Sequence, residues 1–101
     1  MKEQKISIPR EKIREFCQSR DVIEFAVFGS AIRDDFSLQS DVDVLVTFAP
    51  DAQISLFDLV QMQIELEDIF DRPVDLVEKA SLRNPYRRRE ILKTAQVVYA
   101  F

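Results

Sequence analysis

The sequence predicts an α/β (α+β) fold, in which helices pack against a small mixed β-sheet. Short apolar runs rich in β-branched residues, at 24–28, 42–48 and 74–77, are typical of strands. They alternate with segments whose apolar residues have helical spacing. The chain has 101 residues, 47% of them hydrophobic, which suits one modest core. No repeat or linker divides it, so we expect one domain over residues 1–101.

Composition excludes several classes of function. The net charge of −4 argues against a broad electrostatic surface for nucleic acid, and we expect no direct nucleic-acid binding. The absence of histidine excludes a Ser-His or Cys-His catalytic pair and any His-based metal site. Cys17 is the only cysteine, which fits a reducing compartment. No apolar run is long enough to span a membrane or to form a signal peptide, so we expect a cytoplasmic protein.

The first part of the chain predicts a helix followed by a buried strand. Pro9 suits the first turn of a helix, and apolar residues spaced three and four apart give one amphipathic face over 10–20. Residues 24–28 are short, apolar and partly β-branched. This pattern favours a strand that ends at Gly29, the only glycine in the chain.

The next part holds the strongest strand signal. A short helix over 30–35 and a loop over 36–40 lead to a strand over 42–48. Because side chains alternate along a strand, its two faces carry different residues: Val42, Val44, Val46 and Phe48 on one, Asp41, Asp43, Leu45 and Thr47 on the other. The two aspartates therefore point the same way.

A long helix is predicted over 56–70. Ser55 and Asp58 have the spacing of a capping box, in which each side chain bonds the other residue's backbone N–H. The predicted core-facing residues of this helix are Phe57, Val60 and Ile64, flanked by Leu59, Leu66 and Ile69. The residues predicted to face water are Glu65, Glu67 and Asp68.

Three more elements complete the prediction. A strand over 74–77 carries Asp75 on the face opposite its apolar neighbours, as the previous strand carries Asp43. Asn84, followed by proline, is typical of the start of a helix, which we expect over 86–93. A closing strand follows over 97–99. Tyr86 and Tyr99 are interpreted as packing residues.

The aspartate pair at the start of the second strand has two interpretations. Asp-x-Asp on one strand face places two carboxylates about 7 Å apart, close enough to share a divalent metal ion. A solvent-facing acidic pair is common at strand ends and is the alternative. Asp75, on a later strand, would supply a third carboxylate.

Gly29 and Ser30 fit a phosphate site. A strand that ends at Gly-Ser before a helix presents backbone N–H groups and a hydroxyl, and glycine permits close approach. An ordinary turn with Ser30 as a helix cap is the alternative. Arg33 could pair with phosphate or with nearby acidic residues. The cluster Arg87–Arg89 is either a solvated helix face or a contact with nucleotide or a partner protein.

These residues resemble the DNA polymerase β-like nucleotidyltransferase superfamily. The resemblance lies in Gly29-Ser30, ten intervening residues, then Asp41-x-Asp43, and it spans nearly the whole chain. The short length and further sequence features resemble the minimal members, the MNT proteins: Ala31-x-Arg33, Ser40, and Pro73-Val-Asp75-Leu-Val77. MNT proteins are commonly encoded beside a HEPN-domain protein, as the antitoxin of a toxin–antitoxin pair.

The resemblance implies a polymerase β-like nucleotidyltransferase fold and a metal-dependent enzyme. In that superfamily two carboxylates bind two Mg²⁺ ions, Mn²⁺ being an alternative, that hold a nucleoside triphosphate, and a third activates the attacking hydroxyl. The implied catalytic and metal-binding residues are Asp41, Asp43 and Asp75. The implied nucleotide-binding residues are Gly29, Ser30 and Arg33. ATP would be the substrate, and the amides after Gly29 would hold its phosphates.

The implied activity is AMP transfer to a tyrosine hydroxyl of a cognate HEPN toxin. Family members often carry glycine after the arginine, whereas Asp34 and Asp35 follow Arg33 here. This acidic pair could weaken nucleotide binding or could point to solvent. The alternative function is a catalytically weak or inactive antitoxin that neutralises its partner by binding alone. A small-molecule nucleotidyltransferase is a third hypothesis, although such enzymes add a domain that is missing here. The apolar end at 97–101 leaves room for a homo- or hetero-oligomeric interface.

Overall fold

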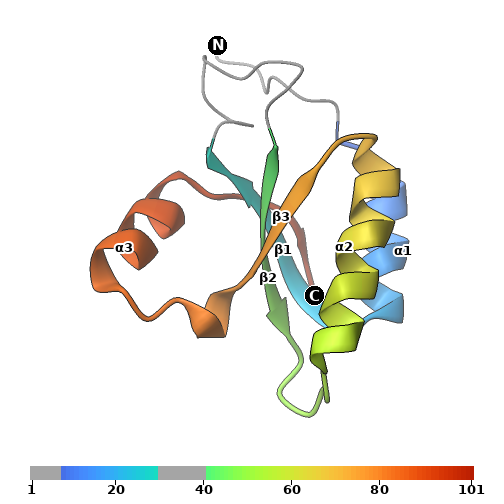
Figure 1. Cartoon of the computed structure of the whole chain (residues 1–101), viewed down its shortest axis with the longest axis horizontal. Helices are drawn as coiled ribbons and strands as arrows, with labels where there is room; N and C mark the ends of the chain where they lie inside the picture. Colours follow the sequence, from blue (N-terminus) through green and yellow to red (C-terminus); the bar gives the residue numbers. More distant parts are fainter. Residues whose placement is uncertain (1–7, 30–40) are drawn as a thin grey trace.

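The computed structural model describes residues 8–29 and 41–101, which form four strands and three α-helices (Figure 1). Their bounds, in chain order, are α1 Arg10–Ser19, β1 Val22–Phe28, β2 Val42–Phe48, α2 Leu56–Phe70, β3 Val74–Glu78, the 3₁₀ turn η2 Lys79–Ser81, α3 Pro85–Thr94 and β4 Gln96–Ala100. The predicted bounds of β2 and α2 are confirmed. β1 begins two residues earlier than predicted, and the helix and loop expected over 30–40 lie outside the described residues.

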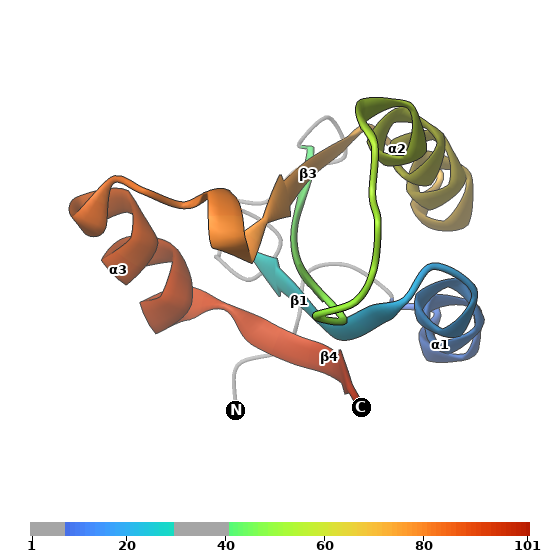
Figure 2. The same ribbon diagram turned by 90° about the horizontal axis from the view of Figure 1, so that it is seen from below.

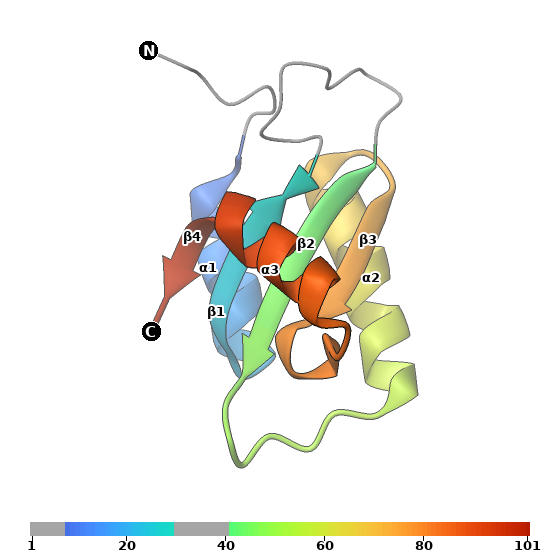
Figure 3. The ribbon, with the colours of Figure 1, turned by 90° about the vertical axis from the view of Figure 1, so that its left-hand side faces the viewer.

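The four strands form one mixed sheet in the order β3-β2-β1-β4. β1 runs antiparallel to β2 and β4, whereas β2 and β3 are parallel. α1 and α2 cover one face of the sheet and α3 covers the other (Figures 2 and 3). This architecture confirms the predicted small mixed sheet with helices packed against it.

The larger core lies between the sheet and the pair α1 and α2. It joins alternate residues of the strands to the inner faces of the two helices, namely Ile13, Phe16, Cys17, Val22, Phe25, Val27, Val42, Val44, Val46, Met62, Leu66, Phe70 and Val74. Phe16 and Phe25 meet edge to face with ring centroids 6.2 Å apart, a favourable geometry for aromatic pairs. The smaller core, under α3, consists of Ala26, Phe28, Leu45, Leu82 and Ile91.

Side-chain hydrogen bonds cap the starts of α2 and α3. The Ser55 hydroxyl accepts a hydrogen bond from the Asp58 N–H at 3.1 Å, and the Asp58 carboxylate accepts one from the Ser55 N–H at 3.0 Å. The backbone bond from Ser55 holds the pKa of Asp58 below its ordinary value. Asn84 caps α3 by accepting from the N–H groups of Tyr86 and Arg87. Both predicted caps are confirmed.

The predicted apolar face of α2 is partly wrong. Phe57, Val60 and Ile64 were expected to face the core, but they are 70%, 56% and 54% exposed. The buried residues are instead Met62, Leu66 and Phe70, flanked by Leu59 and Ile69 as predicted. Apolar side chains occupy more than half of the circumference of this helix, so their spacing alone is compatible with two different buried faces. The sheet covers the one that contains Met62.

Two glutamates of α2 also differ from the prediction that they face water. Glu65 pairs with Arg20 at the end of α1, through Nε–H to Oε1 at 3.2 Å and a second bond from Nη2 to Oε2. This bond raises the pKa of Arg20. Glu67 accepts a hydrogen bond from the Val74 N–H at 3.1 Å. The first contact joins α1 to α2, and the second joins α2 to β3. Within the described ranges, no helix is long and apolar enough to cross a bilayer.

Candidate functional site

Strand β2 carries Asp43 on the face of the sheet that α3 covers, and Asp41 directly precedes the strand. Val42 and Val44 are fully buried under α1 and α2, whereas Leu45 packs in the smaller core under α3. Asp43 lies two residues from Leu45 and so points to the same side, and Asp41 precedes the strand in the same alternation. Asp43 is half-buried and Asp41 is exposed. The predicted direction of Asp43 is confirmed, and that Asp41 points the same way stays a prediction.

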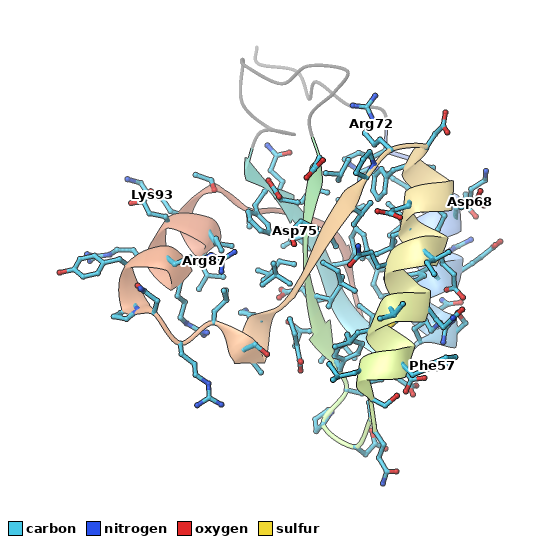
Figure 4. The ribbon with its side chains drawn as sticks, viewed as in Figure 1. Phe57, Asp68, Arg72, Asp75, Arg87 and Lys93 are labelled. Carbon is cyan, nitrogen blue, oxygen red and sulfur yellow. The ribbon has the colours of Figure 1, made fainter. Side chains whose placement is uncertain are left out.

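Strand β3 places Asp75 beside Asp43. In the parallel pairing of β2 with β3, Asp43 is directly opposite Asp75, and Leu45 is opposite Val77. Paired residues of neighbouring strands point to the same face, and the strands are about 4.8 Å apart. The two carboxylates therefore lie side by side, one row beyond the apolar residues that α3 covers. Asp75 is exposed and faces the α3 side of the sheet (Figure 4).

Gly29 lies against the carboxylate of Asp43. It follows β1 with φ of +70°, a conformation that side chains disfavour. A Cβ atom at this position would overlap Oδ2 of Asp43 and stand 3.1 Å from its Cγ. Glycine is therefore required here for two reasons, the backbone conformation and the space that Asp43 occupies. The sequence had suggested close approach to a phosphate, and the structure adds close approach to a carboxylate.

Other predicted site residues cannot be placed in this geometry. Ser30 and Arg33, with the acidic pair Asp34 and Asp35, lie outside the described residues.

Across residues 8–29 and 41–101, no three acidic or cysteine side chains stand close enough to enclose a metal ion by themselves. Mg²⁺ commonly keeps water and substrate phosphates among its ligands. An incomplete set of protein ligands is therefore compatible with such a site.

A groove of about 400 Å³ begins at Asp75 and follows β3. Its walls come from α2, from β3 with η2, and from α3. The lining residues include Leu56, Val60, Asp75, Leu76, Glu78 and Arg87. Sequence reasoning missed this groove because it assigned Val60 to the core. The available signal was that α2 has more apolar residues than one helix face can bury.

The three arginines of the cluster on α3 have different surroundings. Arg88 donates through Nη1 to the Lys79 carbonyl at 3.3 Å, while Arg89 is exposed. Arg87 is on the side of α3 that faces the sheet and lines the same groove as Asp75 (Figure 4). The prediction that Tyr86 packs is wrong, because its side chain is 80% exposed.

Cys17 is not part of this site. It is fully buried in the larger core, on the opposite face of the sheet from Asp43. Burial raises the pKa of its thiol to about 12. A thiol that is neutral and inaccessible at neutral pH does not serve as a nucleophile. Cys17 is therefore not a candidate nucleophile for this site.

The chain is similar in sequence to known nucleotidyltransferases. Residues 10–98 match the family described as the nucleotidyltransferase domain. A protein of Methanocaldococcus jannaschii named as a protein adenylyltransferase is 33% identical over 84 residues, covering 83% of this chain and 84% of that protein. The protein adenylyltransferase MntA of Thermococcus cleftensis is 40% identical over 63 residues, which is 62% of each chain.

Solved structures share the fold. A structure described as a minimal nucleotidyltransferase aligns with a TM-score of 0.71 at 30% identity, covering 86% of both chains. A toxin–antitoxin structure with AMP-PNP aligns with a TM-score of 0.76 at 18% identity, covering 93% of this chain and 75% of that one. A chain from the complex of the tri-AMPylated HEPN toxin of Shewanella oneidensis with MNT antitoxin gives 0.66 at 17% identity, covering 91% and 70%.

Proposed function

The chain belongs to the nucleotidyltransferase domain family, and on that premise we propose that it transfers AMP from ATP to a tyrosine hydroxyl of a partner protein. The partner would be a HEPN-domain toxin, which the modification silences. The chain would then act as the antitoxin of the pair. The observation that carries this proposal is the row formed by Gly29, Asp43 and Asp75 on one face of the sheet.

That row fits a divalent cation and the phosphates it holds. Carboxylate oxygens are the ligands that Mg²⁺ and Mn²⁺ prefer. The space that glycine leaves at the end of β1 is filled by an Asp43 oxygen, so the backbone shape is adapted to that carboxylate. We assign Asp41, Asp43 and Asp75 as the residues that would hold two Mg²⁺ ions. When bound, the ions would neutralise phosphate charge and lower the pKa of the acceptor hydroxyl.

The chain's own residues would act on both substrates. Gly29 and Ser30, through backbone N–H groups and a hydroxyl, and Arg33 would hold the phosphates of ATP. Asp75 would orient the tyrosine and accept its proton on a carboxylate oxygen. The tyrosine oxygen then forms a bond to the α-phosphorus, the bond from that phosphorus to the β-phosphate oxygen breaks, and pyrophosphate leaves.

Two observations support the proposed partner: the names of the relatives and the exposure of Asp75. A protein adenylyltransferase is among the relatives, and structural neighbours include an AMPylated HEPN toxin in complex with MNT antitoxin. Asp75 is exposed on the surface of the sheet rather than buried. An exposed carboxylate can reach a hydroxyl on a macromolecule, which a closed pocket could not admit.

The direct test is transfer of label. The purified chain, labelled ATP, Mg²⁺ and the HEPN-domain protein encoded beside its gene are incubated, and label on that protein is measured. We expect transfer that is lost in Asp41→Asn and Asp43→Asn. Asp68→Asn is the matched control, because Asp68 is an exposed carboxylate on α2, away from the proposed site (Figure 4).

Two results would contradict the proposal. One is transfer that persists at the wild-type rate in both aspartate variants. The other is inhibition of the HEPN protein without label, at equal strength in the wild type and in both variants. The second result would identify an antitoxin that works by binding alone.

A further inference from the structure

The groove beside Asp75 runs along a strand edge that is open in the described part of the chain. β3 is the last strand of the sheet on this side and pairs only with β2 there. The Val74 N–H donates to Glu67 on α2 instead of to β2. Because backbone direction alternates along a strand, the N–H and carbonyl groups of Leu76 and Glu78 also point away from β2. Such an edge is a template for an added strand.

The α2 wall of the groove is apolar and exposed. Leu56 and Val60 line the groove and are 81% and 56% exposed. They lie one helical turn apart, so they form one continuous contact surface on the helix. Phe57, on the outer side of α2, points away from the sheet (Figure 4). Apolar side chains placed beside an open strand edge are suited to a polypeptide.

The opposite wall of the groove carries one cationic side chain, Arg87, while Asp75 and Glu78 line the groove along β3. Arg87 forms no ion pair with any residue of the described ranges. A guanidinium attracts carboxylates and binds them with paired hydrogen bonds. The groove therefore combines strand pairing, an apolar contact and a cationic contact next to the proposed catalytic carboxylate.

We propose that the acceptor protein docks here by adding an extended segment to the open edge of β3. Its backbone would pair with Leu76 and Glu78, an apolar side chain would contact Leu56 and Val60, and a carboxylate would face Arg87. The docked tyrosine then reaches Asp75. This inference rests on the proposed function, and it names the substrate feature that the same site selects.

The alternation of side chains along the added strand gives a sequence rule for the acceptor. Neighbouring residues of an extended segment point to opposite faces. Asp75 and Arg87 lie on the α3 side of the sheet, whereas Leu56 and Val60 lie on the α2 side. The tyrosine and the acidic residue should therefore be two positions apart. The apolar residue should be adjacent to the tyrosine.

A charge exchange tests this rule with defined probes. Two fluorescent decapeptides carry one tyrosine with leucine beside it, and glutamate or lysine two positions from the tyrosine. We expect the wild type to bind the glutamate peptide at least about tenfold more tightly, an energy difference ordinary for a contact residue at an interface. Arg87→Glu should reverse the preference. Equal binding of both peptides to the wild type, or an unchanged preference in Arg87→Glu, would overturn the proposal.

Transfer to the HEPN-domain protein gives a second readout. Leu56→Ser with Val60→Ser should raise the KM for the acceptor about tenfold while leaving the KM for ATP unchanged. Ile64→Ser is the matched control on α2, and Arg89→Glu is the control on α3 for Arg87→Glu, because both residues are exposed and neither lines the groove. A raised KM for ATP instead would assign the groove to the nucleotide and overturn the docking proposal. If the wild type transfers no label, the proposed function fails, while the peptide experiment still decides on docking.

Hydrogen exchange tests the strand pairing itself. Binding of the glutamate peptide should slow exchange of the Leu76 and Glu78 amides, because the added strand accepts hydrogen bonds from them. Exchange that is unchanged at both amides would contradict pairing with β3.

Discussion

The two faces of the sheet are built for different tasks. Among the described residues, thirteen form the apolar core under α1 and α2, and five form the core under α3. On the α3 side, Asp43 and Asp75 stand side by side at the start of their strands. A single strand, β2, serves both faces through the alternation of its side chains. We infer that the first face supplies most of the stability and that the second supplies the chemistry.

The largest expected effect on stability comes from a cavity on the first face. Leu66 is fully buried, so Leu66→Ala should lower the free energy of unfolding by about 2–5 kcal/mol, measured by urea denaturation. Ile64 on the same helix is 54% exposed, and Ile64→Ala should change it by less than about 0.5 kcal/mol. Similar losses in both variants would show that α2 does not pack as described.

Gly29→Ala tests the second face with a smaller expected effect on stability. The positive φ should destabilise the fold by about 1–2 kcal/mol, and the new Cβ would displace the Asp43 carboxylate. AMP transfer should therefore fall as well, measured at a temperature where the variant is fully folded. Asp71→Ala is the matched control, because Asp71 also has a positive φ, of 56°, but lies at the end of α2. The prediction is wrong if both variants retain transfer equally.

The smallest expected effect concerns the start of α2, which forms one end of the groove. The folded state lowers the pKa of Asp58 through the Ser55 backbone bond. The stability that Asp58 contributes is therefore fully present above the pKa of the unfolded carboxyl group, about 4. This contribution is lost as the pH falls through the lower pKa of the folded state. Asp58→Ala should lower the urea midpoint slightly at pH 7 and have no effect at pH 2. A difference that persists unchanged at pH 2 would refute this assignment.

Local sequence signals predicted most elements, because each depends on residues close together in the chain. Ser55 with Asp58, and Asn84 before a proline, determine helix starts through short-range hydrogen bonds. Alternation of valine with aspartate predicted which way Asp43 points. The order of the strands depends on pairing between distant segments, which spacing does not encode. Neither the position of β3 at the edge nor its register beside β2 could be predicted.

The candidate site was predictable as a set of residues and only partly as a geometry. The motif with Gly29 and Asp43 indicated a metal and phosphate site, and the sheet brings these two residues into contact. The partly wrong assignment of α2 has a physical cause. Its apolar residues exceed what the sheet can cover, so Val60 could occupy either face, and only tertiary packing decides. The same excess leaves the apolar wall of the groove exposed.

The central claim is that metal and nucleotide bind on the α3 side of the sheet. Nuclear magnetic resonance of the chain with ATP and traces of paramagnetic Mn²⁺ tests it most directly, because Mn²⁺ broadens the signals of nearby amides. We predict selective broadening at Gly29, Asp43 and Asp75, with the amides of α1 and of the centre of α2 unaffected. Asp43→Asn should remove the effect. Broadening centred between α1 and α2, or broadening that persists at the same sites in Asp43→Asn, would contradict the claim.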